Sequence, residues 1–314
     1  MDVSVLIATY NRAAILGQAI DAFAAQRTPA ALRWELLVVD NNSRDDTRGV
    51  VDRHARDFIA PLRYLFEPRQ GKSHALNAGL RAAHGEVVAF VDDDVLVPPD
   101  WVATVQRVLD RWGADGAGGR ILPKWEISPP QWLVNSPLLR ARLALVEVEA
   151  PEVLAIPMTG QARVWGANMA FRRTVFDQIG GFDVRLGPTG TRAVNYEDYD
   201  LLERAITSGH RVVYDPELTV YHRIPAARMR MGHFRRWEFN TALGVALRSP
   251  IPMGRYSLLG RPARLYLRTA KLLGRWLIAA SLRKPIALQS ELAFFGAAGA
   301  LWWYPESRKP TARG

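Results

Sequence analysis

Three consecutive acidic residues, Asp92, Asp93 and Asp94, directly follow an apolar run in the sequence. Adjacent carboxylates repel one another and raise each other's pKa unless a cation neutralises them. Hard oxygen ligands of this kind suit Mg²⁺ or Mn²⁺, and a divalent ion at this point could clamp a diphosphate. The alternative is an acidic turn that caps the helix expected after Pro99.

Two further apolar runs also end in polar residues. Asp40 follows Val38-Val39, and Thr9, Asn11 and Arg12 follow the first run of the chain. A carboxylate such as Asp40 can accept hydrogen bonds from a base imide or a ribose hydroxyl. Each segment alone is equally well explained by a turn that caps the next helix. The three strand ends together favour a nucleotide site.

The elements that must position these residues alternate between strands and helices over the first 120 residues. We expect strands at 3–8, 34–40, 63–67 and 86–91, and helices at 13–26, 45–59, 72–83 and 99–112. This βαβ rhythm predicts an α/β fold with a mostly parallel sheet, helices on both faces, and ligands beyond the carboxyl ends of the strands. The polar strand ends should therefore meet at one edge.

The second part of the expected catalytic domain is less regular. Prolines are frequent in 122–160, which predicts an irregular connection with one helix at 137–148. A strand is expected at 163–171, a helix at 197–208, and two short strands at 211–214 and 218–221. We expect the domain to span 1–222, with a nucleotide half at about 1–121 and an acceptor half at about 160–222.

The sequence resembles the family 2 glycosyltransferases, which are inverting enzymes with the GT-A fold, a Rossmann-like sheet flanked by helices. The matching pieces occur in the family's order: VLIATYNR at 5–12, VVDNNS at 38–43, GKSHALNAG at 71–79, DDD at 92–94, GGFD at 180–183 and ED at 197–198. The resemblance covers roughly residues 1–222. It implies transfer of a sugar from a nucleotide-sugar donor to an acceptor hydroxyl.

The resemblance also implies roles for individual residues. The donor nucleotide, for which a UDP-sugar is expected, would be bound by Thr9, Asn11, Arg12, Asp40, Lys72, Asp92 and Asp93. Mn²⁺ or Mg²⁺ would be held by Asp94 and His222. Asp198 would be the general base, at a helix start where the dipole keeps a carboxylate ionised. The acceptor side would include Trp165, Asn168 and Glu197.

Each assignment has a structural alternative, and other function classes remain open. Asp198 and Glu197 could merely cap a helix, and His222 and Trp165 could be core residues. A nucleotidyltransferase on a similar sheet would release diphosphate instead of a nucleoside diphosphate.

The acceptor is expected to be a lipid-linked or cell-envelope saccharide. The absence of cysteine restricts any metal to oxygen and imidazole ligands and fits a cytoplasmic protein.

The basic excess of the chain lies in its last third. Residues 1–222 hold 24 Lys+Arg and 28 Asp+Glu, whereas 223–314 hold 17 and 3. Basic residues recur at steps of three and four from Arg261 to Arg275, opposite an apolar face from Ala263 to Leu277, as in an amphipathic helix at a membrane interface. We therefore expect 223–314 to be a helical membrane-associating appendage that attaches the protein peripherally to the inner face of the cell membrane.

Two alternatives apply to this basic region. It could be a solvated face packed on the catalytic domain, or it could bind nucleic acid, as the sequence pI of about 10.2 suggests. The acidic first 222 residues argue against a nucleic-acid partner. The apolar stretch from Leu292 to Tyr304 is 13 residues long, short of the ~20 that a spanning helix needs.

Overall fold

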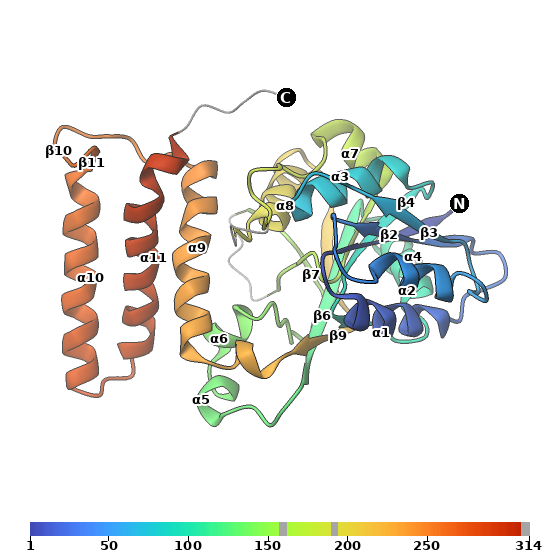
Figure 1. Ribbon diagram of the computed structural model, residues 1–314, viewed down its shortest axis with the longest axis horizontal. Coiled ribbons are helices and arrows are strands. Elements are labelled where there is room, and N and C mark those ends of the chain that lie inside the picture. The colour runs from blue at the N-terminus through green and yellow to red at the C-terminus, as the bar shows by residue number, and fades with distance from the viewer. Residues whose placement is uncertain (157–161, 190–193, 309–314) are drawn as a thin grey trace. The chain divides into compact units, whose positions relative to one another are not determined.

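The computed structural model of the protein describes residues 1–156, 162–189 and 194–308 (Figure 1). The chain divides into two compact units. The first comprises Met1–Val184 and Glu197–Ala226, and the second comprises Arg185–Tyr196 and Ala227–Gly314. The two units are described separately below.

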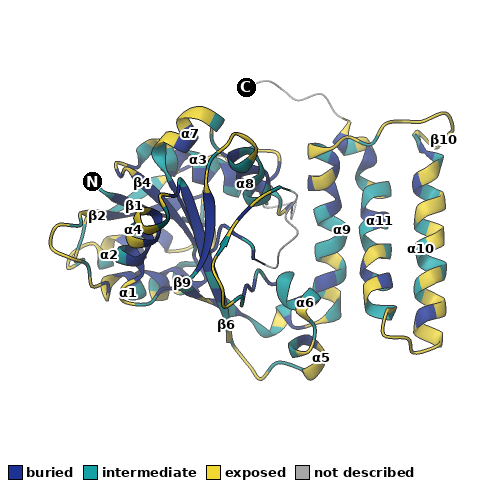
Figure 2. Ribbon diagram, turned by 180° about the vertical axis from the view of Figure 1, so that it is seen from behind, coloured by how far each residue is buried: buried dark blue, intermediate teal, exposed yellow. Residues whose placement is uncertain are grey.

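The first unit is built on a sheet with the strand order β3-β2-β1-β4-β8-β6-β9-β5, in which β7 also pairs with β9. Its first four strands are parallel: β1 Val3–Thr9, β2 Trp34–Asp40, β3 Leu62–Phe66 and β4 Val87–Asp92. The helices between and after them are α1 Ala13–Ala24, α2 Thr47–His54, α3 Lys72–Ala82 and α4 Trp101–Trp112. Because helices cover the sheet, β2 is buried along its whole length, and its central residues Leu36–Val39 are apolar (Figure 2).

The remaining strands make the sheet mixed. Strand β8, Met169–Arg172, runs antiparallel to both β4 and β6, Gly116–Trp125. Strand β9, Val212–Ile224, is parallel to β6 and antiparallel to β5, Val95–Leu96, and β7, Glu152–Val153. The helices of this part are α5 Gln131–Val134, α6 Pro137–Ala141, α7 Arg173–Ile179 and α8 Glu197–Thr207.

Several expected elements differ from those observed. The strand expected at 163–171 is confined to Met169–Arg172, the helix expected at 137–148 ends at Ala141, and the two strands expected at 211–214 and 218–221 form the single strand β9. Strand β6 lies in a glycine-rich segment that strand propensity disfavours. A Cβ on Gly119 would lie 1.9 Å from the carbonyl oxygen of Leu218, so the irregular register of β6 against β9 requires glycine there.

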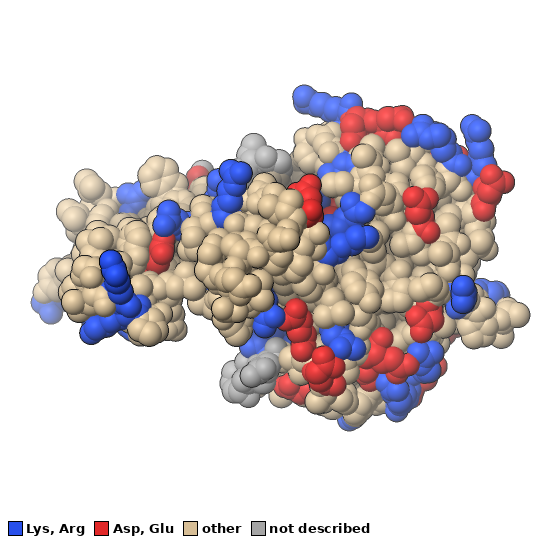
Figure 3. Space-filling view, turned by 90° about the horizontal axis from the view of Figure 1, so that it is seen from below, with Lys and Arg blue, Asp and Glu red and all other residues tan. Residues whose placement is uncertain are grey.

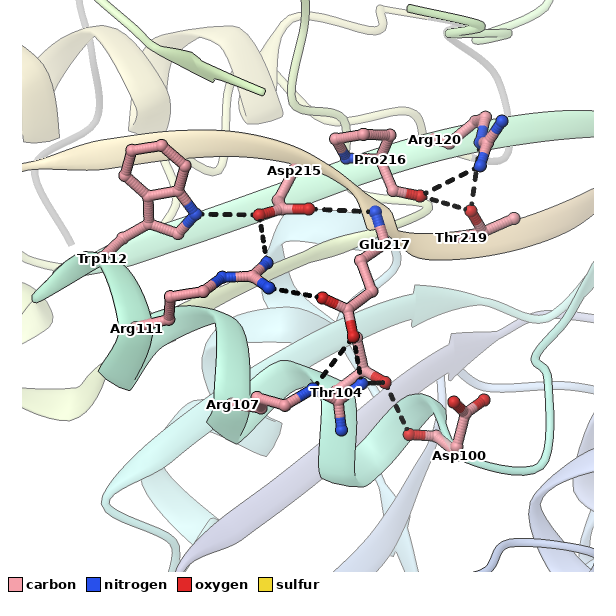
Figure 4. Close-up of polar contacts among 10 residues, drawn as sticks. All are labelled: Asp100, Thr104, Arg107, Arg111, Trp112, Arg120, Asp215, Pro216, Glu217 and Thr219. Atoms are coloured by element: carbon pink, nitrogen blue, oxygen red, sulfur yellow. Dashed lines mark hydrogen bonds and ion pairs between the residues drawn. The ribbon is translucent and has the colours of Figure 1, made fainter. Parts of the chain in front are cut away.

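A charged network fastens α4 to β9 (Figure 4). Arg111 Nη1 lies 2.7 Å from Glu217 Oε2, and the same guanidinium also pairs with Asp215. Arg107 donates to Glu217 as well, and Trp112 Nε1 donates to Asp215 Oδ2 at 2.8 Å. Because these groups pair with one another, the network holds α4 against β9.

The second unit is helical. Its long helices are α9 Met231–Arg248, α10 Ala263–Ser281 and α11 Ala287–Ser307, with a small hairpin of β10 Ser257–Leu258 and β11 Arg261–Pro262 before α10. Helix α11 packs against both α9 and α10. A Cβ on Gly299 would lie 2.1 Å from the carbonyl oxygen of Phe239, which shows how closely α11 approaches α9. Among the described residues, no helix combines the length and apolarity needed to cross a membrane.

Candidate active site

The carboxyl ends of β1, β2 and β4 meet at one edge of the sheet, as the sequence predicts. Thr9 Oγ1 donates a hydrogen bond to Asp93 Oδ2 at 2.8 Å, which joins β1 to the acidic turn after β4. The backbone N–H of Asn41 donates to the carbonyl oxygen of Thr9 at 2.9 Å, which joins β2 to β1. Thr9, Asp40 and Asp93 are all buried.

Asp40 is held by two hydrogen bonds. Its Oδ1 accepts from the N–H of Ser43 at 2.8 Å, and its Oδ2 accepts from the hydroxyl of Tyr64 at 2.7 Å. Burial and the contact with Asp40 raise the pKa of Tyr64 well above its usual value, so the phenol remains a donor. Sequence reasoning missed Tyr64. It could have been found from β3, because this tyrosine lies on the strand that pairs with β2.

Asn11 joins the loops that follow β1 and β2. It has a φ of 52°, in the left-handed region that asparagine tolerates better than most residues. Its N–H donates to Ser43 Oγ at 2.9 Å, and its Oδ1 accepts from the N–H of Arg44 at 2.7 Å. The contacts of Asn11 therefore shape the rim of the site.

Arg12 faces the acidic turn. Its Nη1 lies 2.7 Å from Asp93 Oδ1 and 3.2 Å from Asp94 Oδ2. Burial raises the pKa of Asp93 to about 6, although Arg12 opposes this shift. Asp93 in turn raises the pKa of the guanidinium. The charge of Arg12 and the hydrogen bond from Thr9 thus oppose the rise in the pKa of Asp93 that burial causes.

Asp94 and His222 approach each other in a way that suits a cation. His222 Nε2 lies 3.4 Å from Asp94 Oδ1, and both residues are buried. The other ring nitrogen, Nδ1, lies 3.0 Å from the carbonyl oxygen of Leu143 and can only donate to it. In a neutral ring this leaves a lone pair on Nε2 facing a carboxylate, an arrangement that a proton or a metal ion between them would relieve.

Within the described ranges, no group of three or more His, Asp or Glu side chains could hold a metal ion by itself. Mg²⁺, however, keeps several waters and is often bound through one or two carboxylates together with substrate phosphates. Asp94 supplies one such carboxylate and His222 an imidazole beside it, so a bound ligand would have to complete the coordination.

Lys72 links the acidic turn to the start of α8. It is the first residue of α3, and its Nζ lies 2.7 Å from Asp92 Oδ1 and 3.5 Å from Glu197 Oε1. Burial lowers the pKa of this ammonium, but Asp92, Asp198 and Glu197 together outweigh burial and raise it. Lys72 is therefore a permanent cation at the site.

Asn41 orients the turn before Lys72, a role that sequence reasoning missed. Its Oδ1 accepts from the N–H of Gly71 at 2.8 Å, and its Nδ2 donates to the carbonyl oxygen of Arg69 at 2.7 Å. Gly71 has a φ of 138°, where a side chain would be strained. An asparagine directly after a strand and a glycine directly before a lysine were the available signals.

Glu197 and Asp198 form the first turn of α8. Oδ2 of Asp198 accepts from the N–H of Gly166 at 2.8 Å. Its Oδ1 is enclosed and has no hydrogen-bond partner among the described residues. A Cβ on Gly166 would lie 2.6 Å from the Asp198 carboxylate, so only glycine permits this approach. Burial raises the pKa of Asp198, and burial with the charge of Asp198 raises that of Glu197 to about 8.

The three residues expected on the acceptor side have different surroundings in the structure. Glu197 contacts Lys72. Trp165 adjoins Gly166 and is half-buried, with an indole Nε1 that lacks a partner in the described part of the chain. Asn168 is fully buried, and its amide bonds Trp101 Nε1 and the carbonyl oxygens of Arg120 and Leu218. The structure therefore does not bring Asn168 to the site.

The sequence was compared with known families and curated proteins. The profile described as "Glycosyl transferase family 2" matches residues 4–180. A curated relative, the "Glucosyl-dolichyl phosphate glucuronosyltransferase" of Haloferax volcanii, is 27% identical over 236 residues, which are 71% of this chain and 70% of the relative.

Solved structures share the fold. The mannosyltransferase PcManGT from Pyrobaculum calidifontis, solved in complex with GDP-Man and Mn²⁺, superposes with a TM-score of 0.61 at 22% identity, covering 98% of this chain and 88% of that one. Residues 1–349 of S. aureus TarS, solved in complex with UDP, superpose with a TM-score of 0.57 at 16% identity. The match covers 99% of this chain and 93% of that one. These likenesses confirm the GT-A type of α/β fold.

Proposed function

The chain belongs to glycosyl transferase family 2, and from this premise we propose a metal-assisted, inverting sugar transfer with Asp198 as general base. The donor is a nucleotide sugar, and the acceptor is a hydroxyl of a lipid-linked or cell-envelope saccharide. The observation that carries the proposal is the contact of Lys72 with both Asp92 and Glu197. It joins the donor edge of the sheet to α8, whose second residue is the proposed base.

The donor nucleotide is proposed to bind at the ends of β1, β2 and β4. Asp40 keeps a fixed orientation through Tyr64 and Ser43, which suits recognition of a base or a ribose. Arg12 and Lys72 are cations beside the acidic turn, and both suit a diphosphate. A UDP-sugar is favoured, with support from a relative of the same fold that binds UDP, although another relative binds GDP-Man.

Asp94 and His222 are proposed to hold Mn²⁺ or Mg²⁺. Their 3.4 Å approach and the contact of His222 Nδ1 with Leu143 support this role. The Mn²⁺ in the PcManGT complex is consistent with it. A bound ion would stabilise the charge that develops on the departing diphosphate. Arg12, which already contacts Asp93 and Asp94, would share that charge with the ion.

Asp198 is proposed to take the proton of the acceptor hydroxyl as the new bond forms. The acceptor oxygen attacks the anomeric carbon, the bond from that carbon to the phosphate oxygen breaks, and the nucleoside diphosphate leaves. The raised pKa of Asp198 makes it a stronger base than an ordinary carboxylate once it is ionised. The Gly166 N–H fixes one carboxylate oxygen, and the enclosed Oδ1 is the one left to accept a proton.

A panel of nucleotide sugars, assayed for transfer and hydrolysis with Mn²⁺ or with EDTA, tests the proposal. Asp198→Asn and Asp94→Asn should each lose at least about 100-fold in kcat, whereas the exposed Asp177→Asn on α7 should match the wild type. Nucleotide binding should persist in Asp198→Asn, because this residue is not assigned to the donor. Undiminished turnover in either of the first two variants would refute that residue's role.

The reaction products separate this function from nucleotidyl transfer on a similar sheet. A glycosyltransferase releases a nucleoside diphosphate, whereas a nucleotidyltransferase releases inorganic diphosphate. Release of inorganic diphosphate from a nucleoside triphosphate and a sugar 1-phosphate, with no nucleoside diphosphate released from any nucleotide sugar, would reject sugar transfer. Inversion is checked from the anomeric configuration of the product sugar, which should be opposite to that of the donor.

A further inference from the structure

The helical unit contains a long segment without acidic residues. Residues 239–290 include nine Lys and Arg and no Asp or Glu. Figure 3 shows basic side chains separated by uncharged surface on the helical unit, with little acidic surface on that face. By contrast, Arg235 on α9 pairs with Glu291 of α11.

Besides Arg264, which donates to the carbonyl oxygen of Pro252, five cations from α10 and the turn after it are exposed: Arg268, Lys271, Arg275, Arg283 and Lys284. In the part of the chain that the structure describes, none of them forms an ion pair with a carboxylate. Their ammonium and guanidinium groups are therefore available to an external anion.

Large aliphatic side chains are exposed beside these cations. Leu267 is 71% exposed and Ile278 is 61% exposed, and Leu277 and Leu282 are more than half exposed. The inward face of α10, which includes Leu265 and Ala279, packs toward α11. Much of α10 is accordingly marked as exposed in Figure 2. Exposed aliphatic groups in such number are unfavourable in water and indicate an apolar partner.

A groove lies where the cations and the aliphatic groups adjoin. It has a volume of about 480 Å³ and is lined by Lys271, Gly274, Arg275, Ile278, Ala279, Lys284 and Ile286. A Cβ on Gly274 would meet nothing within 4 Å, so the groove is open at that glycine. The groove thus combines three cationic groups with an apolar lining, which matches a phosphate attached to a hydrocarbon chain.

We propose that α10 binds the surface of an anionic membrane, with a phospholipid phosphate in the groove formed by Lys271, Arg275 and Lys284. The aliphatic side chains would enter the boundary between head groups and acyl chains, and the basic stems would extend toward the phosphates. The cytoplasmic leaflet carries the anionic lipids of a cell membrane, so attachment to the inner face follows. The proposal does not depend on the sugar transfer proposed above.

Two other occupants fit the surface less well. A second copy of this chain would bring cations against cations, because the face offers no carboxylate. A nucleic acid would use the cations but gain little from exposed leucine and isoleucine, since bases stack on aromatic rings. An anionic lipid surface uses both kinds of side chain.

The proposal is tested by flotation of the full chain with vesicles of phosphatidylcholine alone or mixed with phosphatidylglycerol. Wild-type protein should bind the mixed vesicles. The triple variant Lys271→Gln/Arg275→Gln/Lys284→Gln should bind them about 100-fold more weakly, as expected for three surface cations. A matched control, Arg27→Gln/Arg56→Gln/Arg81→Gln, removes the same charge from exposed positions of the other unit and should bind like the wild type.

A second variant isolates the apolar contribution. Leu267→Ser/Ile278→Ser/Leu282→Ser keeps every charge, and it should lose the binding that the wild type retains in about 0.5 M salt, where exposed charges are screened. Equal losses in the basic triple variant and its control, or no effect of the serine substitutions, would overturn the proposal. If the wild type binds duplex DNA and the basic triple variant does not, the surface would be assigned to nucleic acid instead. Unchanged far-ultraviolet circular dichroism and an unchanged melting temperature confirm that the variants are folded.

Discussion

The ammonium of Lys72 lies 2.7 Å from Oδ1 of Asp92. The same ammonium lowers the pKa values of Glu197 and Asp198, against the burial that raises them. It is thus the group that makes an ionised base possible in an enclosed, acidic site. A single lysine joins two requirements of the site, charge balance at the donor edge and ionisation of the base.

Replacing Lys72 with methionine should therefore change the pH dependence of the reaction. Without the cation, the pKa values of Asp198 and Glu197 rise, and the acid limb of kcat/KM should move to higher pH by roughly 1–3 units. A pH profile from about 5 to about 10 provides the measurement. Lys124→Met on β6 is the matched control and should leave the limb in place. An unshifted limb in Lys72→Met would show that this lysine does not govern the base.

The raised pKa of Glu197 leads to a prediction about the pH dependence of stability. Its pKa is about 8 in the folded protein and near 4.5 when unfolded, so the folded state holds the proton more tightly between these values. The free energy of unfolding contributed by this group is therefore greatest below pH 4.5 and is lost as pH rises toward 8. Glu197→Gln cannot ionise, so it should flatten the decline of the melting temperature across that window. Glu203→Gln, on the same helix, should preserve the wild-type slope.

Much of the fold and part of the site could be predicted because the local strand and helix patterns agree with the way the parallel strands pair. Parallel strands place their carboxyl ends at one edge, so Thr9, Asp40 and Asp92 could be brought together from the strand pattern alone. Strand β6 escaped prediction because its glycines serve close approaches, such as that of Gly119 to the backbone of β9. The β9 contact is made by residues about 100 positions later in the chain.

The supporting residues of the site were harder to predict than the charged ones. Tyr64 and Asn41 act by hydrogen bonding to Asp40 and Gly71, and such pairings depend on the register of neighbouring strands and loops. Asn168 shows the opposite case, since the resemblance implies an acceptor-side position and the residue is fully buried instead. Its partners are backbone carbonyls of β6 and β9, which no local pattern discloses.

Tyr64→Phe tests the fixed orientation of Asp40. The substitution keeps the ring and removes one hydrogen bond to a charged group, which is worth about 1.5–3 kcal/mol. The affinity for the donor nucleotide should fall roughly 10-fold or more while kcat changes little, because Tyr64 does not contact the proposed base. Isothermal titration with nucleoside diphosphate measures the first effect, and saturating kinetics measures the second. Tyr10→Phe, an exposed position, should bind nucleotide normally. A fall in kcat at unchanged affinity would contradict the positioning role.

Gly166→Ala tests the approach of the backbone to Asp198. The added Cβ would lie 2.6 Å from the carboxylate, so either the turn before β8 or the side chain of Asp198 must move. A displacement of about 1 Å at a catalytic group costs on the order of 100-fold in rate. We therefore expect kcat to fall by that amount with the donor affinity retained, because the donor edge is built from other strands. Gly17→Ala in α1 has ordinary space for its Cβ and should be fully active, with a stability gain of up to about 1 kcal/mol. If Gly166→Ala retains full activity, the enclosed geometry of Asp198 is not required for transfer, and its assignment as the base loses its structural support.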